Sequence, residues 1–174
     1  MKKKLKYLIV IIISFILILA ICKLFFFIHE KRTIKDRTSQ MPEFEMKTIH
    51  EMLFTKENID RAYPILFLYF NSECDYCLIE IKEIVRNIEK FENIRIFLVS
   101  SESVQRILTF QTINNLDNYH NITFLSDYQN SFPDIFNVRL LPSSLVYDKS
   151  GKLILRVDGA VRADYLLEKM NCLQ

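Results

Sequence analysis

The feature that most constrains the fold is a pair of cysteines placed where a strand-like segment meets a helical one. The run from Ile65 to Phe70 is apolar and rich in branched and aromatic residues, which is typical of a buried strand. Cys74 and Cys77 follow after a short polar break, and apolar residues then recur at helical spacing. A cysteine at a helix N-terminus faces free N–H groups and the positive end of the helix dipole, which stabilise a thiolate. A strand, Cys-x-x-Cys and a helix in this order predict a thiol–disulfide redox centre.

Charge is distributed unevenly along the 174 residues. Residues 1–37 carry nine basic and two acidic side chains, a net charge of +7, whereas residues 38–174 have a net charge of −5. An acidic domain behind a basic N-terminus argues against a nucleic-acid partner and favours a membrane. With only two glycines, the chain has no Gly-rich phosphate-binding loop or dinucleotide fingerprint.

An almost wholly apolar segment, residues 7–28, follows the basic head of the chain. Its 22 residues are enough to span a bilayer. A cleavable signal peptide and a lipoprotein site at Cys22 are the alternatives, and neither has the small residues that cleavage requires. We predict a single-pass transmembrane anchor within residues 1–37, with the N-terminus inside, and one domain, residues 38–174, on the periplasmic or extracytoplasmic side. The basic residues flanking the segment are nearly balanced, so they leave the topology open.

Strand and helix patterns alternate along the remaining chain. We expect strands at residues 43–49, 65–70, 94–100, 122–125, 143–147 and 153–157, and helices at residues 50–63, 75–91, 101–119, 128–136 and 162–171. Alternation predicts parallel crossovers, and the turn from Asp148 to Gly151 predicts an antiparallel hairpin at one edge. The predicted fold class is therefore α/β, with one mixed sheet flanked by helices on both sides.

Three segments together resemble a known family. They are Cys74-Asp-Tyr-Cys77, the run Leu141-Pro142-Ser-Ser-Leu-Val-Tyr-Asp-Lys-Ser-Gly151, and Val157-Asp-Gly159. Over roughly residues 42–170 the chain resembles a thioredoxin fold, and more narrowly the membrane-anchored, extracytoplasmic thioredoxin-like reductases of the TlpA and ResA type. That type carries an inserted helix–strand unit, which residues 101–125 match.

The resemblance implies roles for three further residues. Pro142 would be a cis proline lying against the disulfide, and it would expose the backbone of Leu141 for pairing with a partner's peptide. Glu80 would assist proton movement at the redox pair, although an ordinary solvated charge is the alternative. The sequence departs from the family pattern in four places. Glu73 replaces a tryptophan, and Asp75-Tyr76 replaces the more usual Gly-Pro or Glu-Pro pair. The acidic residue that thioredoxins bury near the redox centre has no obvious match, and Leu141 stands where a threonine is frequent.

The predicted function is a protein-disulfide reductase. Cys74 would attack a client disulfide and Cys77 would resolve the mixed disulfide. Glu73 and Asp75 flank Cys74 with negative charge, which disfavours its thiolate and makes the pair more reducing. The partners would be protein thiols and disulfides together with an electron-donating redox protein.

Other functions remain as alternatives. One is a static disulfide in a non-catalytic interaction module, and another is an oxidase or isomerase of the same fold. A zinc site would need a second Cys-x-x-Cys, and a peroxiredoxin would need Pro-x-x-x-Thr-x-x-Cys, and the sequence has neither. We therefore predict no metal and no cofactor.

Overall fold

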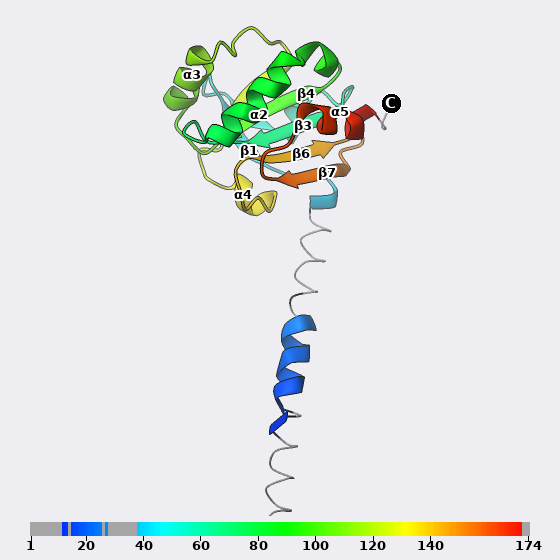
Figure 1. Cartoon of the computed structure of the whole chain (residues 1–174). Helices are drawn as coiled ribbons and strands as arrows, with labels where there is room; N and C mark the ends of the chain where they lie inside the picture. The colour runs from blue at the N-terminus through cyan, green and yellow to red at the C-terminus, as the bar shows by residue number, and fades with distance from the viewer. Residues whose placement is uncertain (1–11, 14, 26, 28–37, 172–174) are drawn as a thin grey trace, which may run out of the picture. The chain divides into compact units, whose positions relative to one another are not determined.

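The computed structural model describes residues 12–13, 15–25, 27 and 38–171. The chain divides into two compact units, residues 1–37 and residues 38–174 (Figure 1). In the first unit residues 15–25 are helical and exposed. Among the described residues, no helix is both long enough and apolar enough to cross a membrane. Much of the predicted anchor at residues 7–28 lies outside the described residues.

The second unit is built on one sheet. Its described strands are β1 (Glu45–Thr48), β2 (Leu53–Thr55), β3 (Ile65–Tyr69), β4 (Arg95–Ser100), β5 (Ile122–Ser126), β6 (Ser143–Tyr147) and β7 (Leu153–Asp158). Their order across the sheet is β2-β1-β5-β4-β3-β6-β7. The strands β3, β4 and β5 are parallel, whereas β1 and β2 at one side and β6 and β7 at the other are antiparallel to their neighbours. This is the mixed sheet that the sequence predicted.

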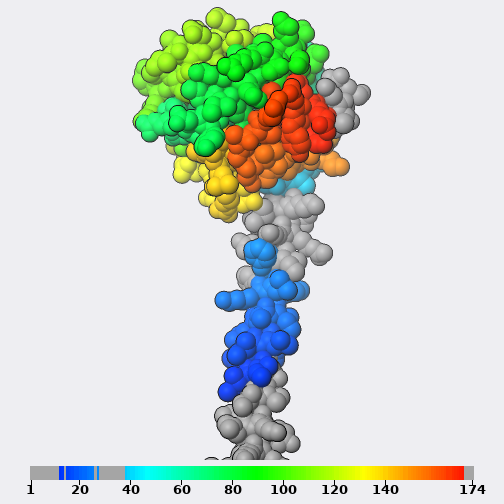
Figure 2. All heavy atoms as spheres, viewed as in Figure 1, coloured from blue at the N-terminus to red at the C-terminus, as the bar shows by residue number. Residues whose placement is uncertain are grey.

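Helices and short segments cover both faces of this sheet. They are η1 (Lys56–Asn58), α2 (Asp75–Arg86), η2 (Ile88–Phe91), α3 (Val104–Ile113), α4 (Phe132–Ile135) and α5 (Ala163–Asn171). Side chains of α2, α3 and α5 belong to one hydrophobic cluster on one face of the sheet. Figure 2 shows α2 lying between α3 and the orange and red chain around α5. Both β3–α2–β4 and β4–α3–β5 advance in the same direction across the sheet. Right-handed crossovers therefore place α2 and α3 on the same face.

The central strand β3 supplies side chains to both layers. Its five residues are all buried, as expected for a strand covered on both sides. Leu66 and Leu68 face the layer of α2, α3 and α5. Phe67 faces the opposite layer, where its ring contacts Phe44 and the α4 region through Phe132, as well as other aromatic rings. This packing fixes the end of β3, and with it the start of the loop that carries the cysteines.

The predicted helix at residues 50–63 is wrong. Residues Leu53–Thr55 form β2 instead, paired with β1, and η1 follows. Glu51 has a positive φ of 59° in the tight turn between these strands, which a helix does not allow. Beyond β2, the backbone N–H of Thr55 donates to the side chain of Asn58, which holds the chain in a short 3-10 turn.

Two further helices are shorter than their patterns suggested. The helix expected at residues 101–119 is α3, which begins after its cap Ser103 and ends at Ile113. The helix expected at residues 128–136 is the single turn α4, because buried Asp127 accepts the backbone N–H groups of Ser131 and Phe132 and fixes a loop before it. The predicted β6–β7 hairpin is confirmed.

Candidate active site

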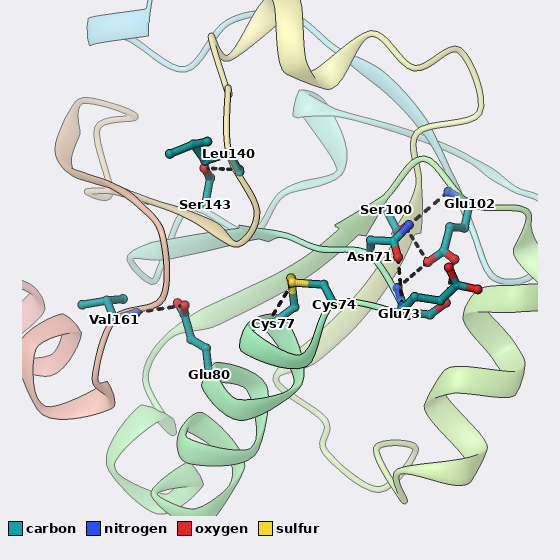
Figure 3. The surroundings of a disulfide bond; sticks show 11 residues. Asn71, Glu73, Cys74, Cys77, Glu80, Ser100, Glu102, Leu140, Ser143 and Val161 are labelled. Carbon is teal, nitrogen blue, oxygen red and sulfur yellow. Dashed lines mark hydrogen bonds between the residues drawn. A yellow bond between two sulfur atoms is a disulfide. The ribbon is translucent and has the colours of Figure 1, made fainter.

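Cys74 and Cys77 form a disulfide at the N-terminus of α2. Cys74 is the N-cap of this helix, and its Sγ accepts the backbone N–H of Cys77 at 3.2 Å (Figure 3). Cys77 is fully buried in the hydrophobic core, whereas Cys74 is only partly buried. An external thiol or disulfide can therefore reach Cys74 but not Cys77. An accessible sulfur at the positive end of a helix, with a buried partner, is the arrangement that thiol exchange requires.

Pro142 is brought to the same end of the sheet by strand pairing. Ser143, the first residue of β6, pairs with Tyr69, the last residue of β3. The Leu141–Pro142 peptide bond is cis, as the resemblance implied. Gly159 donates its N–H to the Pro142 carbonyl at 2.8 Å, and the Ser143 hydroxyl donates to Leu140 O at 2.8 Å. These bonds hold the segment before β6 in place above the redox helix in Figure 3.

Glu80 lies one turn further along α2, and the structure buries it. Its side chain is 1% exposed, so it is not a solvated surface charge. It accepts the Ser144 hydroxyl at 2.6 Å and the Val161 N–H at 3.1 Å. Burial raises the pKa of Glu80 to about 7, although both hydrogen bonds oppose that shift. A carboxyl group with this pKa exchanges a proton near neutral pH.

Glu83, one turn further along α2, also accepts a backbone N–H from the chain near the start of α5. Its carboxylate accepts the N–H of Ala163, the first residue of α5, at 3.2 Å. The spacing of three residues places Glu83 on roughly the same side of α2 as Glu80, and the fold turns that side toward the chain before α5. Together they fasten α2 to the segment that joins β7 to α5.

The loop before Cys74 is held by residues that the sequence did not single out. Glu102 follows β4, and its side chain is 9% exposed. Its carboxylate accepts the Ser72 N–H at 2.7 Å and the Ser72 hydroxyl at 2.6 Å. Arg106, in the first turn of α3, forms ion pairs with both Glu102 and Glu73. The only signal in the sequence was that β3 and β4 should be adjacent parallel strands, whose carboxyl ends meet at one edge.

Figure 3 separates these groups in space. Glu73 and Glu102 lie on one side of the disulfide, and Glu80 and Val161 lie on the other. Four apolar side chains are exposed in the segments that carry the disulfide and Pro142: Tyr76 and Ile79 of α2, and Leu140 and Leu141 before Pro142. Within the described part of the chain, no three His, Cys, Asp or Glu side chains are grouped as metal ligands.

Comparison with solved structures supports the fold assignment. The exposed lipoprotein thioredoxin Etrx1 of Streptococcus pneumoniae is 18% identical, with a TM-score of 0.60, over 75% of this chain and 99% of that one. A secreted disulfide oxidoreductase of Mycobacterium tuberculosis homologous to Escherichia coli DsbE is 18% identical, with a TM-score of 0.63, over 79% and 98%. Peroxidoxin BcpB of M. tuberculosis is 16% identical, with a TM-score of 0.67, over 78% and 96%. At these identities the likeness concerns the fold.

Comparison with family models identifies the family. The model of the AhpC/TSA family matches residues 38–156, which is more than half of the chain and includes both cysteines, Glu80 and Pro142. The comparison with curated proteins found no match. The chain therefore belongs to the AhpC/TSA family of thioredoxin-like proteins.

Proposed function

We propose that the protein is a thiol–disulfide oxidoreductase that reduces disulfides in other proteins. The observation that carries this proposal is the disulfide at the N-terminus of α2, in which Cys74 is accessible and Cys77 is buried. A purely structural disulfide gains nothing from an accessible sulfur at a helix N-terminus. An exchanging pair needs that sulfur for the attack and needs its partner shielded from competing thiols.

The reaction follows from this asymmetry. In the reduced protein the Cys74 thiolate attacks one sulfur of a client disulfide, which forms a mixed disulfide and releases the first client thiolate. Cys77 then loses its proton and attacks the Cys74 Sγ, which releases the second client thiolate and restores the protein disulfide. Two electrons have passed to the client. A dithiol redox partner returns them by the same exchange in reverse.

Glu80 is proposed to carry the proton in this reaction. Its pKa of about 7 means that it is partly ionised at neutral pH. It lies on α2 one turn beyond Cys77, in surroundings that exclude water. A buried carboxyl group in this state can take the proton that Cys77 releases and return it when the pair is reduced again.

The surface around Cys74 suits a polypeptide client. Tyr76 is 68% exposed and Leu140 is 59% exposed, and the apolar side chains of Ile79 and Leu141 are exposed as well. The backbone of Leu141, beside the cis proline, is proposed to pair with an extended client segment. Apolar side chains with backbone pairing favour a protein over a small disulfide such as oxidised glutathione.

The reduction potential tests the direction of electron flow. Glu73 and Asp75 place negative charge beside Cys74, so we expect a value closer to that of thioredoxin, about −270 mV, than to that of DsbA, about −120 mV. Equilibration of the purified domain with glutathione buffers and quantification of its thiols gives this value. A potential near that of DsbA would assign the protein to the oxidases.

The N-terminal segment is proposed to tether the domain to a membrane, with the domain on the extracytoplasmic side. Residues 7–28 are almost wholly apolar and follow a basic head. We expect the full chain to remain in the membrane fraction after carbonate extraction, and a chain that starts at Thr38 to be in the soluble fraction. Protease added outside spheroplasts should digest the domain. Recovery of the full chain in the soluble fraction would contradict the tether.

A further inference from the structure

We propose that Arg106 is a positioning residue that sets the redox equilibrium of the Cys74–Cys77 pair by neutralising carboxylates beside the redox loop. The inference rests on the proposed function only in that the pair must undergo reversible reduction. Arg106 belongs to α3, about 30 residues beyond the cysteines, and neither the motif nor the resemblance pointed to it.

Arg106 contacts three side chains at the loop before Cys74. Its Nε lies 2.9 Å from a Glu102 carboxylate oxygen and donates to the Ser72 hydroxyl at 3.3 Å, and its Nη2 pairs with Glu73. Ser72 and Glu73 are the two residues immediately before Cys74. A guanidinium has a planar set of donors that suits several acceptors at once. Arg106 therefore holds its positive charge against the two residues that precede Cys74.

Glu102 places a negative charge close to the loop before Cys74, and the guanidinium of Arg106 neutralises it. Its side chain is nearly buried and is bound by the Ser72 N–H, the Ser72 hydroxyl and the Ser100 hydroxyl. These contacts hold the carboxylate against Ser72, two residues before Cys74. Glu73 adds a second carboxylate, 76% exposed, on the same side of the disulfide (Figure 3). Two carboxylates and one guanidinium leave this cluster with a net charge of −1.

The cluster acts on the reduced protein more than on the oxidised one. Two molecules of glutathione reduce the protein disulfide, giving two cysteine thiols and one glutathione disulfide, and the Cys74 thiol then releases its proton. A thiolate carries a negative charge, which nearby carboxylates disfavour and a nearby guanidinium favours, whereas the disulfide is neutral. Removing the guanidinium therefore shifts the equilibrium toward the disulfide, and removing a carboxylate shifts it toward the dithiol.

The experiment is a double-mutant cycle at Arg106 and Glu73, in which the equilibrium with glutathione is measured on the full chain in detergent. Arg106→Gln should lower the equilibrium constant for reduction by glutathione by about two- to tenfold, and Glu73→Gln should raise it by a similar factor. A tenfold change corresponds to about 30 mV for this two-electron couple. The equilibrium constant of the double variant should be close to that of the wild type. Arg106→Lys keeps the positive charge, so its equilibrium constant should also stay close to the wild-type value. Both single shifts should shrink in 1 M salt because exposed charges are screened.

The signs distinguish this role from a merely structural one. Arg106→Gln and Glu73→Gln both break the same ion pair, so a loosened loop would move the equilibrium in the same direction in both variants. Shifts of the same sign, or no shift in Glu73→Gln, would overturn the proposal. Glu73 is mostly exposed, so Glu73→Gln should fold, and its equilibrium constant tests the proposal even if Arg106→Gln folds poorly. The measurement uses the protein's own thiols, so a failure to reduce client proteins would refute the proposed function without affecting this result.

Discussion

Replacing Cys74 by serine is expected to lower the rate of insulin-disulfide reduction to that of the buffer alone. Cys77 is fully buried, so it cannot take over the attack on a client when Cys74 is lost. Serine is close to cysteine in size and can still accept the Cys77 N–H at the helix N-cap, so the fold should survive. Turbidity of precipitating insulin B chain, with dithiothreitol as the electron source, measures the rate.

Cys22→Ser is the matched control for this experiment. Cys22 is an exposed free cysteine outside the domain, and its loss should leave the rate unchanged. Cys77→Ser should instead trap the client as a mixed disulfide on Cys74, which is visible on non-reducing gels. Equal rates in the wild type and in Cys74→Ser would show that the pair is a static disulfide, and the oxidoreductase proposal would fail.

Glu80→Gln is expected to stabilise the oxidised protein at high pH by about 3 kcal/mol, and to have little effect near pH 4. The folded protein holds the pKa of Glu80 at about 7, above the ordinary value of 4.5. Between these values the folded state keeps a proton that the unfolded state has released, so stability falls as the pH rises. Glutamine cannot ionise, and it resembles the protonated acid toward Ser144 and Val161. Urea unfolding at pH 4, 6 and 8 measures the difference.

Glu83→Gln provides the control, because it removes a less buried carboxylate from the same helix. A gain of the same size and pH dependence in that variant would assign the effect to the charge of α2 rather than to the burial of Glu80. Lower stability of Glu80→Gln than of the wild type at pH 8 would mean that the ionised carboxylate is favoured in the folded protein. Either result would remove the physical basis for Glu80 as a proton carrier.

The local pattern around the cysteines was sufficient to predict this part of the fold. A short run rich in branched and aromatic residues between polar segments, such as β3, is typical of a strand covered on both faces, and the helical repeat after Cys74 has one apolar side. The β6–β7 hairpin was equally clear from the turn residues Asp148 to Gly151, and Gly151 has a φ of 81° in that turn. In contrast, the segment at residues 50–63 lacks a strong period, and its strand exists only because β1 provides a partner.

The parts of the site that could not be predicted depend on contacts between distant residues. Glu80 could be assigned to a helix but not to its buried side, because its partners Ser144 and Val161 are more than 60 residues away. Glu73 was treated as an unpaired charge, and only the folded chain brings Arg106 to it. Because Glu102 joins the same cluster, its net charge stays negative, and Asp75 adds to the negative charge beside Cys74.

The burial of Cys77 has a consequence for how the protein withstands oxidants. Peroxides reach Cys74 first and convert its thiolate to a sulfenic acid, and further oxidation of that group to a sulfinic acid is irreversible. Cys77 is out of reach of the oxidant and within bonding distance of Cys74. It can condense with the sulfenic acid to give the disulfide, with loss of water, which removes the group that a second oxidant would attack. Enclosing the resolving sulfur thus limits chemical damage to a state that a dithiol can repair.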